Sequence, residues 1–406
     1  MINIFTSANF LVPLRDKLPQ WSVIACDQFT SQPEYWDKVK EIAGDEPSAY
    51  NIILPEAMLS QLSPEKISQI NSCMFDYLSR ELFRTFNDSY IYVERTLLDG
   101  SIRRGVVGVI DLEEYDYKPG STSRIRATEQ TVTERIPARK SIREHAPLEL
   151  SHVILLCDDE RKNLIEPLRI SRHSMRKIYD FELMQGGGNI KGWLVHEENA
   201  RAFNTRMAAY IKRKSQELSL IFAVGDGNHS LAAAKACYEA DKSNPLARYA
   251  MVELENLHDD ALKFEPIHRI VKGVMPEDLI NSVNNNICTQ DINNSWPIKI
   301  YYRDQDKQDK EDTIYIDKSR GASALIVLQK YLDEKKFTID YIHDLDALKE
   351  LSRNFGCVGF EMPEFDSQAK LEFFRVISES GVLPRKTFSM GHAQEKRYYL
   401  EARRIK

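Results

Sequence analysis

The chain has 406 residues, of which 42% are hydrophobic and 29% are charged, and its formal net charge is −6. These values are typical of a globular protein large enough for two domains, and the acidic balance argues against general nucleic-acid binding. No stretch has the length and apolarity of a membrane span, and the N-terminus lacks a signal-peptide pattern, so we expect no membrane partner.

Six cysteines are scattered along the chain without a CxxC pair, at positions 26, 73, 157, 237, 288 and 357. This usage indicates reduced thiols and predicts a cytoplasmic protein. The histidines are also scattered, without paired ligand spacing, so a structural zinc site is not expected.

In the first part of the chain, apolar periodicity predicts a strand at 23–26, a helix over 36–42, a brief strand at 50–55 and a helix from Ser63 to about Phe86. Two antiparallel strands, 90–96 and 103–111, are then expected, and Asp99-Gly100 between them is a hairpin signal.

Residues 124–144 stand out by charge, because six cations alternate with Glu129, Glu134 and Glu144. The pattern is consistent with a solvated face of salt bridges, each contributing roughly 0–1 kcal/mol. It is equally consistent with an anion site, because arginine binds phosphate or carboxylate in a bidentate manner. Arg139 and Arg143 would lie one turn apart on a helix that Pro137 would start, and Arg135 and Arg139 are the candidates for holding the anion.

Three glycines, Gly186, Gly187 and Gly188, lie between two strand-like runs at 179–184 and 190–195. They could form a flexible hairpin, or a loop whose bare backbone closely approaches a ligand. A helix is expected from Glu197 to about Glu217.

The most informative stretch runs from Leu218 to Ala240. Residues 218–224 form an apolar run of strand length, Gly225-Asp226-Gly227-Asn228-His229-Ser230 interrupts it, and a helical pattern begins at Leu231. Such a turn directs backbone N–H groups and the positive end of a helix at one point, where an anion is stabilised. Ser230 or Asn228 could instead cap the helix. The turn matches neither a Walker motif nor a dinucleotide fingerprint.

Beyond the central helix, a strand is expected at 249–254, and His268-Arg269 is a candidate phosphate contact. From 272 to 350 the sequence pattern changes: short helices and strands near 297–302 and 324–328 are expected there, which indicates a peripheral lobe. The tail carries Arg385 and Lys386 and ends in an expected strand at 397–404.

Seven stretches together carry a family pattern: ACDQFTSQPEYW, RATEQTVTERIPARKSIRE, YDFELMQGGGNIKGWLV, AVGDGNHSLAAA, FEPIHRI, YIHDLDAL and LPRKTFSMGHAQEKRYYLEARRI. They resemble the bacterial and archaeal family of unknown function DUF1015 over nearly the whole chain. Many relatives have Asp-Gly-His-His-Arg in the central motif, whereas this chain has Asn228 and Ser230 at the third and fifth positions.

The Asp-Gly-x-His turn is also similar to one in the ParB-like superfamily, which includes free-serine kinases, sulfiredoxin and nucleotide-binding partition proteins. This resemblance covers about ten residues. It implies that the turn and the following helix hold nucleotide phosphates.

We therefore expect an α/β (α+β) protein of two lobes, with a mixed sheet and flanking helices. The main domain is expected over 1–271 and a smaller C-terminal lobe over 272–406, whose last strand returns to the main domain. The strand at 218–224 should be central and buried on both faces.

The functional hypothesis is a phosphotransferase of the serine-kinase type that uses ATP or ADP and Mg²⁺ to phosphorylate a small hydroxylated metabolite, because phosphoryl transfer needs charge neutralisation and positioning. Asp226, His229 and Glu129 are its catalytic candidates, and Asp226 is also the metal ligand. The candidates for holding the nucleotide are Gly227, Asn228, Ser230, Arg135, Arg139, Gly186, Gly187, Gly188, His268, Arg269, Arg385 and Lys386. Two alternatives stay open: a sensor that binds a nucleotide or phosphometabolite without turnover, and a phosphate-ester hydrolase.

Overall fold

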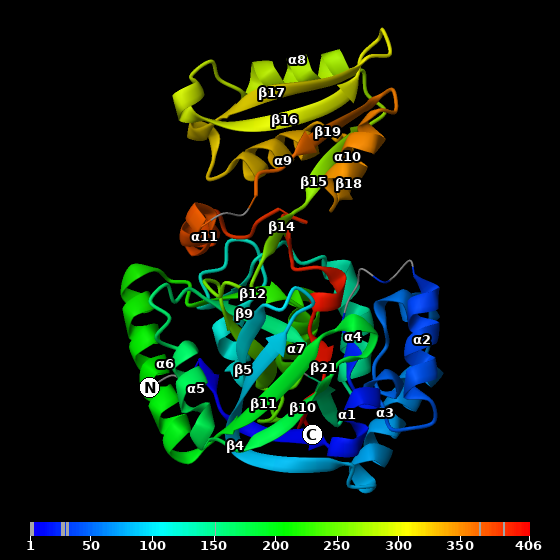
Figure 1. Cartoon of the computed structure of the whole chain (residues 1–406), viewed down its shortest axis with the longest axis vertical. Coiled ribbons are helices and arrows are strands. Elements are labelled where there is room, and N and C mark those ends of the chain that lie inside the picture. The colour runs from blue at the N-terminus through cyan, green and yellow to red at the C-terminus, as the bar shows by residue number, and fades with distance from the viewer. Residues whose placement is uncertain (1–3, 26–28, 30–31, 151, 365–366, 385) are drawn as a thin grey trace. The chain divides into compact units, whose positions relative to one another are not determined.

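The computed structural model of the protein describes residues 4–25, 29, 32–150, 152–364, 367–384 and 386–406. The chain divides into two compact units: unit 1 comprises residues 1–263 and 391–406, and unit 2 comprises residues 264–390. The colour bar of Figure 1 identifies each unit by residue number, and each is described by itself.

Unit 1 is built on a thirteen-stranded mixed sheet, of which ten strands follow one path in the order β6-β7-β12-β9-β13-β5-β4-β2-β22-β8. On this path lie β2 (Ala8–Pro13), β4 (Phe83–Thr96), β5 (Ile102–Asp111), β6 (Tyr115–Asp116), β7 (Ile125–Ala127), β8 (Leu148–Leu150), β9 (Val153–Cys157), β12 (Phe222–Asp226), β13 (Tyr249–Asn256) and β22 (Ala402–Arg404). Off it, β1 (Phe5–Thr6) pairs with β5, and the hairpin of β10 (Lys177–Glu182) and β11 (Asn189–Val195) pairs with β4.

Strand alternation gives this sheet a hydrophobic core on each face. In β4, Tyr90 and Tyr92 belong to one core, and Ile91 and Val93 belong to the other. The first core is completed by α5 (Glu166–Ser171), α6 (Glu197–Glu217) and α7 (Asn228–Ala240), and the second by α1 (Leu18–Trp21), α2 (Pro33–Ala43) and α3 (Pro64–Ser79). Figure 1 shows α5 and α6 (green) and α1 to α3 (blue) on opposite sides of the sheet. The expected mixed α/β fold is confirmed.

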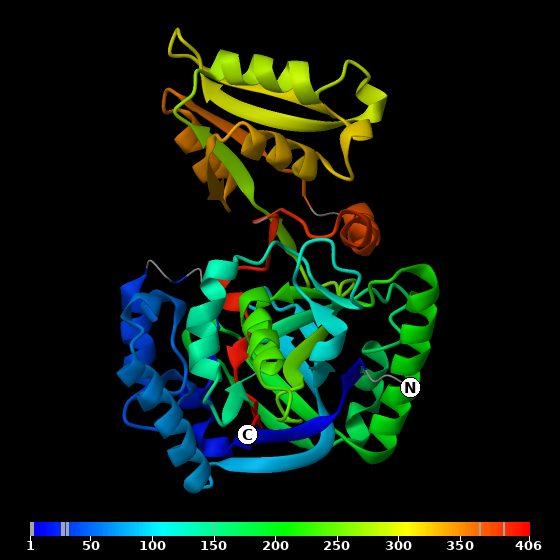
Figure 2. The same cartoon turned by 180° about the vertical axis from the view of Figure 1, so that it is seen from behind.

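Strand β12 is interior in the sheet, between β7 and β9, and Leu220 and Phe222 are fully buried, as expected for the central strand. It begins later than expected, at Phe222, and extends to Asp226. Helix α4 (Ile136–Arg143) packs against the start of α7 through Ile136, Ala232 and Ala233, and the rear view shows the two helices side by side (Figure 2).

Unit 2 contains a five-stranded antiparallel sheet in the order β17-β16-β19-β15-β18. Its strands are β15 (His268–Lys272), β16 (Ser295–Arg303), β17 (Asp309–Asp317), β18 (Thr338–Ile342) and β19 (Cys357–Glu361). Helices α8 (Pro276–Ile287) and α9 (Ala324–Glu334) share one core with the sheet, and α10 (Leu345–Ser352) packs on Ile270 and Tyr301. The unit also contains α11 (Ser367–Ser380) and the ribbon of β14 (Phe264–Pro266) and β20 (Phe388–Met390).

Four local predictions were wrong. Residues 50–55 contain no strand, because a 3-10 helix occupies Ala49–Asn51. The helix that starts after Ser63 ends at Ser79, and the chain is already in β4 at Phe83. The apolar run 324–328 is the start of α9, capped by Ser323, and the expected strand at 397–404 is interrupted, with β21 (Tyr398–Tyr399) paired to β3 (Val23–Ile24) and β22 paired to β2 and β8.

Candidate functional site at the carboxyl end of β12

Strand pairing brings three separate segments to one edge of the unit 1 sheet. Strand β12 is parallel to β7, with Val224 opposite Ala127, and antiparallel to β9, with Asp226 opposite Ile154. Asp226 and Glu129 each lie two residues beyond the Val224–Ala127 pair, so Asp226 ends β12 and Glu129 follows β7 at the same edge. His152, just before β9, lies at the same edge.

The turn between β12 and α7 requires a glycine at position 227. Gly227 has φ +85°, and a Cβ atom there would lie 3.0 Å from Cγ2 and 3.1 Å from Cα of Val153. The amide of Gly227 donates to Oδ1 of Asp226 at 2.8 Å, and among the described residues no side chain caps α7. Oδ1 of Asn228 is buried without a described partner. The helix therefore begins at a polar end whose first turn is suited to an anion.

The loop 128–132 after β7 is joined to this turn by two hydrogen bonds. The Thr128 hydroxyl donates to the carbonyl of Val224 at 2.7 Å, and the Val132 amide donates to Nε2 of His229 at 3.2 Å. Because Nε2 of His229 accepts, the ring proton lies on Nδ1. Oγ1 of Thr131, in the same loop, is buried without a described partner.

Lys396 reaches the edge from the C-terminal segment of the chain. Its ammonium lies 3.6 Å from Oδ2 of Asp226, and its side chain is 9% exposed, compared with 35% for Asp226. Among the described residues this ammonium donates no hydrogen bond, and Asp226 is its ion-pair partner. The side chain is largely buried, and its ammonium has three N–H donors that water or a ligand can satisfy. An anion with several oxygens beside Asp226 would satisfy them.

His152 and Tyr399 add two polar aromatic rings, with centroids 4.9 Å apart. Burial lowers the pKa of His152, and its Nδ1 lies 3.2 Å from the carbonyl oxygen of Leu150, so that nitrogen carries the proton. Burial raises the pKa of the Tyr399 hydroxyl, while the charge of Arg139 opposes the shift and the charges of Glu56 and Asp226 add to it. The charges of Arg139, Glu56 and Asp226 are therefore all close enough to Tyr399 to influence its ionisation.

Two candidate arginines, Arg139 on α4 and Arg135 immediately before it, converge on Glu56, a residue 83 positions away from Arg139. Arg139 forms a close ion pair with Glu56, and Nη1 of Arg135 lies 3.9 Å from Oε1 of the same carboxylate. Arg139 is 16% exposed and Arg135 is 49% exposed. Arg139 is thus held next to the site by a tertiary contact, and Arg135 retains access to solvent.

Of the three glycines at 186–188, Gly187 lies against the C-terminal segment and Gly188 lies against β4. The carbonyl of Gly187 accepts a hydrogen bond from Nε of Arg95 at 3.0 Å. A Cβ on Gly187 would lie 2.5 Å from Oη of Tyr398, and one on Gly188 would lie 2.0 Å from the Thr96 carbonyl oxygen. Gly186 has open space beside it. Contact of these glycines with a nucleotide stays a prediction.

The remaining candidates belong to unit 2, apart from Arg385, which lies outside the described residues. Nδ1 of His268 accepts a hydrogen bond from the amide of Met362 at 3.0 Å, and burial lowers the pKa of the ring. Arg269 is buried, with Nε donating to Oε1 of Gln329 at 3.0 Å and the guanidinium 5.2 Å from the ring centroid of Tyr341. Lys386 is described with φ +59°. A phosphate role for these three residues stays a prediction.

The residues that the sequence analysis missed are Lys396, His152, Tyr399 and Glu56. Lys396 and Tyr399 lie in the family-like stretch of the tail, which was the one available signal for them. Nothing local in the sequence marks His152 or Glu56, because tertiary pairing places them at this edge.

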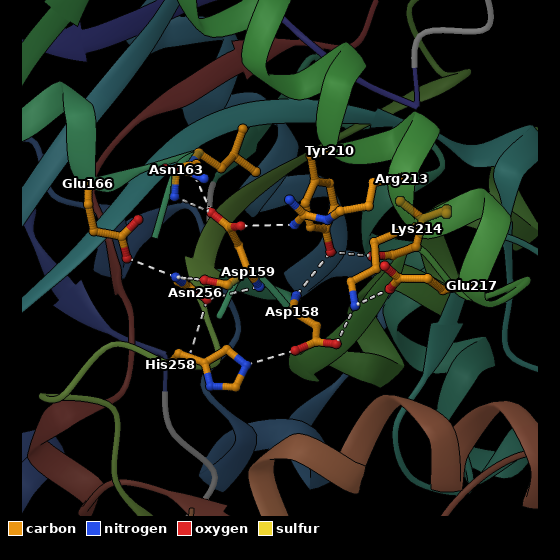
Figure 3. A network of polar contacts seen from close by, with 12 residues as sticks. Asp158, Asp159, Asn163, Glu166, Tyr210, Arg213, Lys214, Glu217, Asn256 and His258 are labelled. Atoms are coloured by element: carbon orange, nitrogen blue, oxygen red, sulfur yellow. Dashed lines mark hydrogen bonds and ion pairs between the residues drawn. The ribbon is translucent and has the colours of Figure 1, made fainter. Parts of the chain in front are cut away.

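A second polar cluster lies at the opposite edge, where β9 and β13 end (Figure 3). Asp158 accepts from Lys214 and is bound to Nε2 of His258, each at 2.7 Å, and Asp159 accepts from Arg213 at 3.0 Å. Burial raises the pKa of Asp158, but the hydrogen bonds from His258 and Lys214 outweigh it and hold the pKa below its ordinary value of 3.8. Within this cluster, Asp158, Asp159, Arg213 and Lys214 pair with one another's charges.

Two features are absent from the described residues. No group of three or more His, Cys, Asp or Glu side chains is arranged to hold a metal ion. No helix in that part of the chain has both the length and the apolar character needed to span a bilayer.

A model of the family described as "Protein of unknown function (DUF1015)" matches residues 11–403. No curated protein matches the chain. Among solved structures, a C-terminally truncated SbnI from Staphylococcus aureus is 12% identical, with TM-score 0.36 and coverage of 70% of this chain and 81% of that chain. A free serine kinase in complex with AMP is 12% identical, with TM-score 0.33 and coverage of 72% and 92%. A mutant free serine kinase in complex with ADP is 11% identical, with TM-score 0.34 and the same coverage of 72% and 92%. At these scores the likenesses carry no functional argument.

Proposed function

Because the chain belongs to the DUF1015 family, whose description states no function, we propose one from the geometry of its own site. The protein is a nucleotide-dependent phosphotransferase that acts on a small hydroxylated metabolite. The observation that carries this proposal is the Lys396 side chain, which is 9% exposed and whose ammonium lies 3.6 Å from Asp226 with no described hydrogen bond.

The other groups at this edge fit the demands of phosphoryl transfer, which are mainly positioning and charge neutralisation. The uncapped start of α7 offers backbone N–H groups and a positive helix end to a phosphate. Lys396 supplies one positive charge, and Arg139 on α4 and Arg135 just before it supply two more, which share the single carboxylate of Glu56. The arrangement is suited to a nucleotide whose phosphates lie along the first turn of α7.

In the proposed reaction, a hydroxyl oxygen of the metabolite forms a bond to the terminal phosphorus, and the bond from that phosphorus to the bridging oxygen of the nucleotide breaks. Asp226, 35% exposed, takes the hydroxyl proton. His229 is anchored by the Val132 amide through Nε2, and its Nδ1–H side orients the substrate or stabilises charge on the transferred group.

A nucleotide-bound Mg²⁺ fits this edge, because that ion is usually held by one or two carboxylates together with phosphate oxygens. Asp226 and Glu129 would hold it, since both follow paired positions of β12 and β7. The ion would supply further charge neutralisation. In that arrangement Asp226 is a ligand instead of the base.

Free thiols support a reducing compartment for this reaction. All five described cysteines, Cys73, Cys157, Cys237, Cys288 and Cys357, are unpaired with one another. We expect the enzyme to act in the cytoplasm, as reduced cysteine usage suggests.

The test begins with the melting temperature in ATP, ADP or pyrophosphate, with and without Mg²⁺, because a ligand of the folded state raises it. Nucleotide consumption is then measured with pools of hydroxylated metabolites. We expect Asp226→Asn to lower turnover by roughly 10²-fold or more, the scale of a lost acid–base group. His229→Ala should behave likewise, with unchanged dependence on Mg²⁺.

The matched control is Asp241→Asn at the far end of α7, where the carboxylate also accepts a backbone hydrogen bond, from Ser243 at 3.0 Å. It should leave turnover unchanged. Nucleotide binding without turnover would replace the proposal with a sensor, and release of phosphate from esters without a nucleotide would replace it with a hydrolase. Absence of nucleotide binding would overturn the phosphotransferase and a nucleotide sensor, and would leave the hydrolase and a phosphometabolite sensor to be tested with esters alone.

A further inference from the structure

Arg95 of β4 directs its whole guanidinium group at backbone carbonyls. It is 3% exposed, and Nη1 donates to the carbonyls of Lys396 at 2.6 Å and Glu395 at 3.0 Å. Nη2 donates to the carbonyl of Gln394 at 2.5 Å, and Nε donates to that of Gly187 at 3.0 Å. Three of these four acceptors are consecutive residues that end at Lys396.

This use of a buried arginine differs from that of its neighbours. Arg103, Arg397 and Arg403 are buried beside carboxylates, at 3.1 Å from Glu255, 2.6 Å from Glu253 and 2.7 Å from Glu149 respectively. Arg95 forms no ion pair among the described residues. Burial and the charge of Arg103 lower its pKa to about 9. An ion pair therefore does not explain why Arg95 is buried. Neutral carbonyls stabilise a buried cation less well than a carboxylate does, so we look for another role of these four hydrogen bonds.

Besides Arg95, the segment is fixed through Arg397, whose carbonyl accepts from the Ala25 amide at 2.8 Å and whose guanidinium lies 2.6 Å from Glu253. Lys396 lies between the 3-10 helix Ala393–Glu395 and β21, and Arg103 adds one hydrogen bond to the Glu395 carbonyl at 2.9 Å. The ring of Tyr398 lies 5.0 Å from the Arg95 guanidinium, and its hydroxyl donates to the Met184 carbonyl at 2.9 Å. Gly187, which has no room for a Cβ, lies on the other side of the Arg95 guanidinium. We call the carbonyls of Gly187 and residues 394–396, together with the Tyr398 ring, the Arg95 socket.

We propose that Arg95 is the positioning residue that holds the Lys396 ammonium beside Asp226, and that Gly187 forms the opposite wall of its socket. The inference rests on the proposed function, because it assumes that Lys396 binds the nucleotide. Arg95 acts through Lys396 and touches no substrate. A substitution at Arg95 should therefore affect binding only where Lys396 is present.

A double-mutant cycle tests this dependence. The dissociation constant of MgATP is measured by calorimetry for the wild type, Arg95→Lys, Lys396→Met and the double variant. Lysine at position 95 retains the charge but not the fork of donors that spans four carbonyls. We expect Arg95→Lys to weaken binding roughly tenfold in the wild type, and less than twofold in the Lys396→Met background.

The matched control is Arg126→Lys. Arg126 is also buried with neutral partners, donating to the carbonyls of Ser123 at 3.0 Å and Ser121 at 3.1 Å and to the hydroxyl of Ser219 at 2.7 Å. Its partners lie before β7 and β12, at the edge away from Asp226. Both Arg→Lys variants should lower the melting temperature to a similar extent, and Arg126→Lys should leave MgATP affinity unchanged in both backgrounds.

Gly187→Ala perturbs the socket from its other side and serves where Arg95→Lys does not fold. It should show the same dependence on Lys396. Equal weakening by Arg95→Lys in both backgrounds, or no weakening in either, would overturn the positioning role while leaving the proposed function in place. If Lys396→Met alone bound MgATP as tightly as the wild type, the proposed anion site would fail, and this inference with it.

Discussion

Two polar clusters lie at opposite edges of the same sheet in unit 1. Each contains one largely buried lysine, and the two lysines differ in how closely they are paired with carboxylates. At the carboxyl end of β9, Lys214 is 10% exposed and lies 2.7 Å from Asp158 and 2.9 Å from Glu217 (Figure 3). At the carboxyl end of β12, Lys396 is 9% exposed and lies 3.6 Å from Asp226. Equal burial thus accompanies a saturated ion network at one edge and a loosely paired ammonium at the other.

The difference separates structural polar groups from groups that await a ligand. A buried ion pair whose hydrogen bonds are complete contributes order and leaves no capacity for a further partner. A buried cation with one distant carboxylate retains that capacity. The number of charged residues does not identify the ligand site, because the network around Asp158 has more of them and yet its charges are paired.

The largest expected effect on stability is at the saturated cluster. Asp158→Asn removes the charge that meets both Lys214 and His258, so the free energy of unfolding should fall by about 3 kcal/mol, as for other broken buried pairs. Urea unfolding measures this loss. MgATP affinity should not change, and Asp260→Asn, at an acid that is 94% exposed, should alter stability by less than about 0.5 kcal/mol. Weaker MgATP binding in Asp158→Asn would break the separation of the two clusters.

A smaller effect is expected on acidification. Because the folded-state pKa of Asp158 lies below its ordinary value of 3.8, the folded protein binds fewer protons there than the unfolded chain does. The stability from this carboxylate is complete above that value and is lost as the pH falls through the folded-state pKa. The stability difference between the wild type and Asp158→Asn should therefore narrow between pH 5 and pH 2. A constant difference over that range would contradict the assigned pKa shift.

Local signals were enough to identify the strand, turn and helix that carry Asp226 and His229. The glycine at position 227 and the change from an apolar run to helical spacing are both visible in the sequence, and β12 and α7 follow them. Helix α6 begins and ends where its pattern predicts, at Glu197 and Glu217.

Other elements could not be read locally because context overrode the pattern. The run at 324–328 is as apolar and β-branched as a strand, but it continues with buried residues to Leu332 on a helix that Ser323 caps. The short run at 50–55 has no strand partner, and a 3-10 helix over Ala49–Asn51 takes up its start.

The completion of the site depends on long-range pairing. His152 reaches Asp226 because β9 is antiparallel to β12, and Lys396 arrives on a segment that Arg95 anchors to β4. No periodicity in one sequence encodes which strands pair or where a distant tail returns. The family-like tail stretch pointed to the correct region, and only the fold singles out Lys396 within it.

The most direct test compares Lys396→Met with Lys214→Met, measuring MgATP affinity by calorimetry and stability by urea unfolding. We predict that Lys396→Met weakens MgATP binding roughly tenfold or more, which is about 1.4 kcal/mol or more, and leaves stability nearly unchanged. Lys214→Met should leave affinity unchanged and lower stability, because Asp158 loses a hydrogen-bonded partner. Unchanged affinity in Lys396→Met, or weaker binding in Lys214→Met, would contradict the assignment of the ligand site to the carboxyl end of β12.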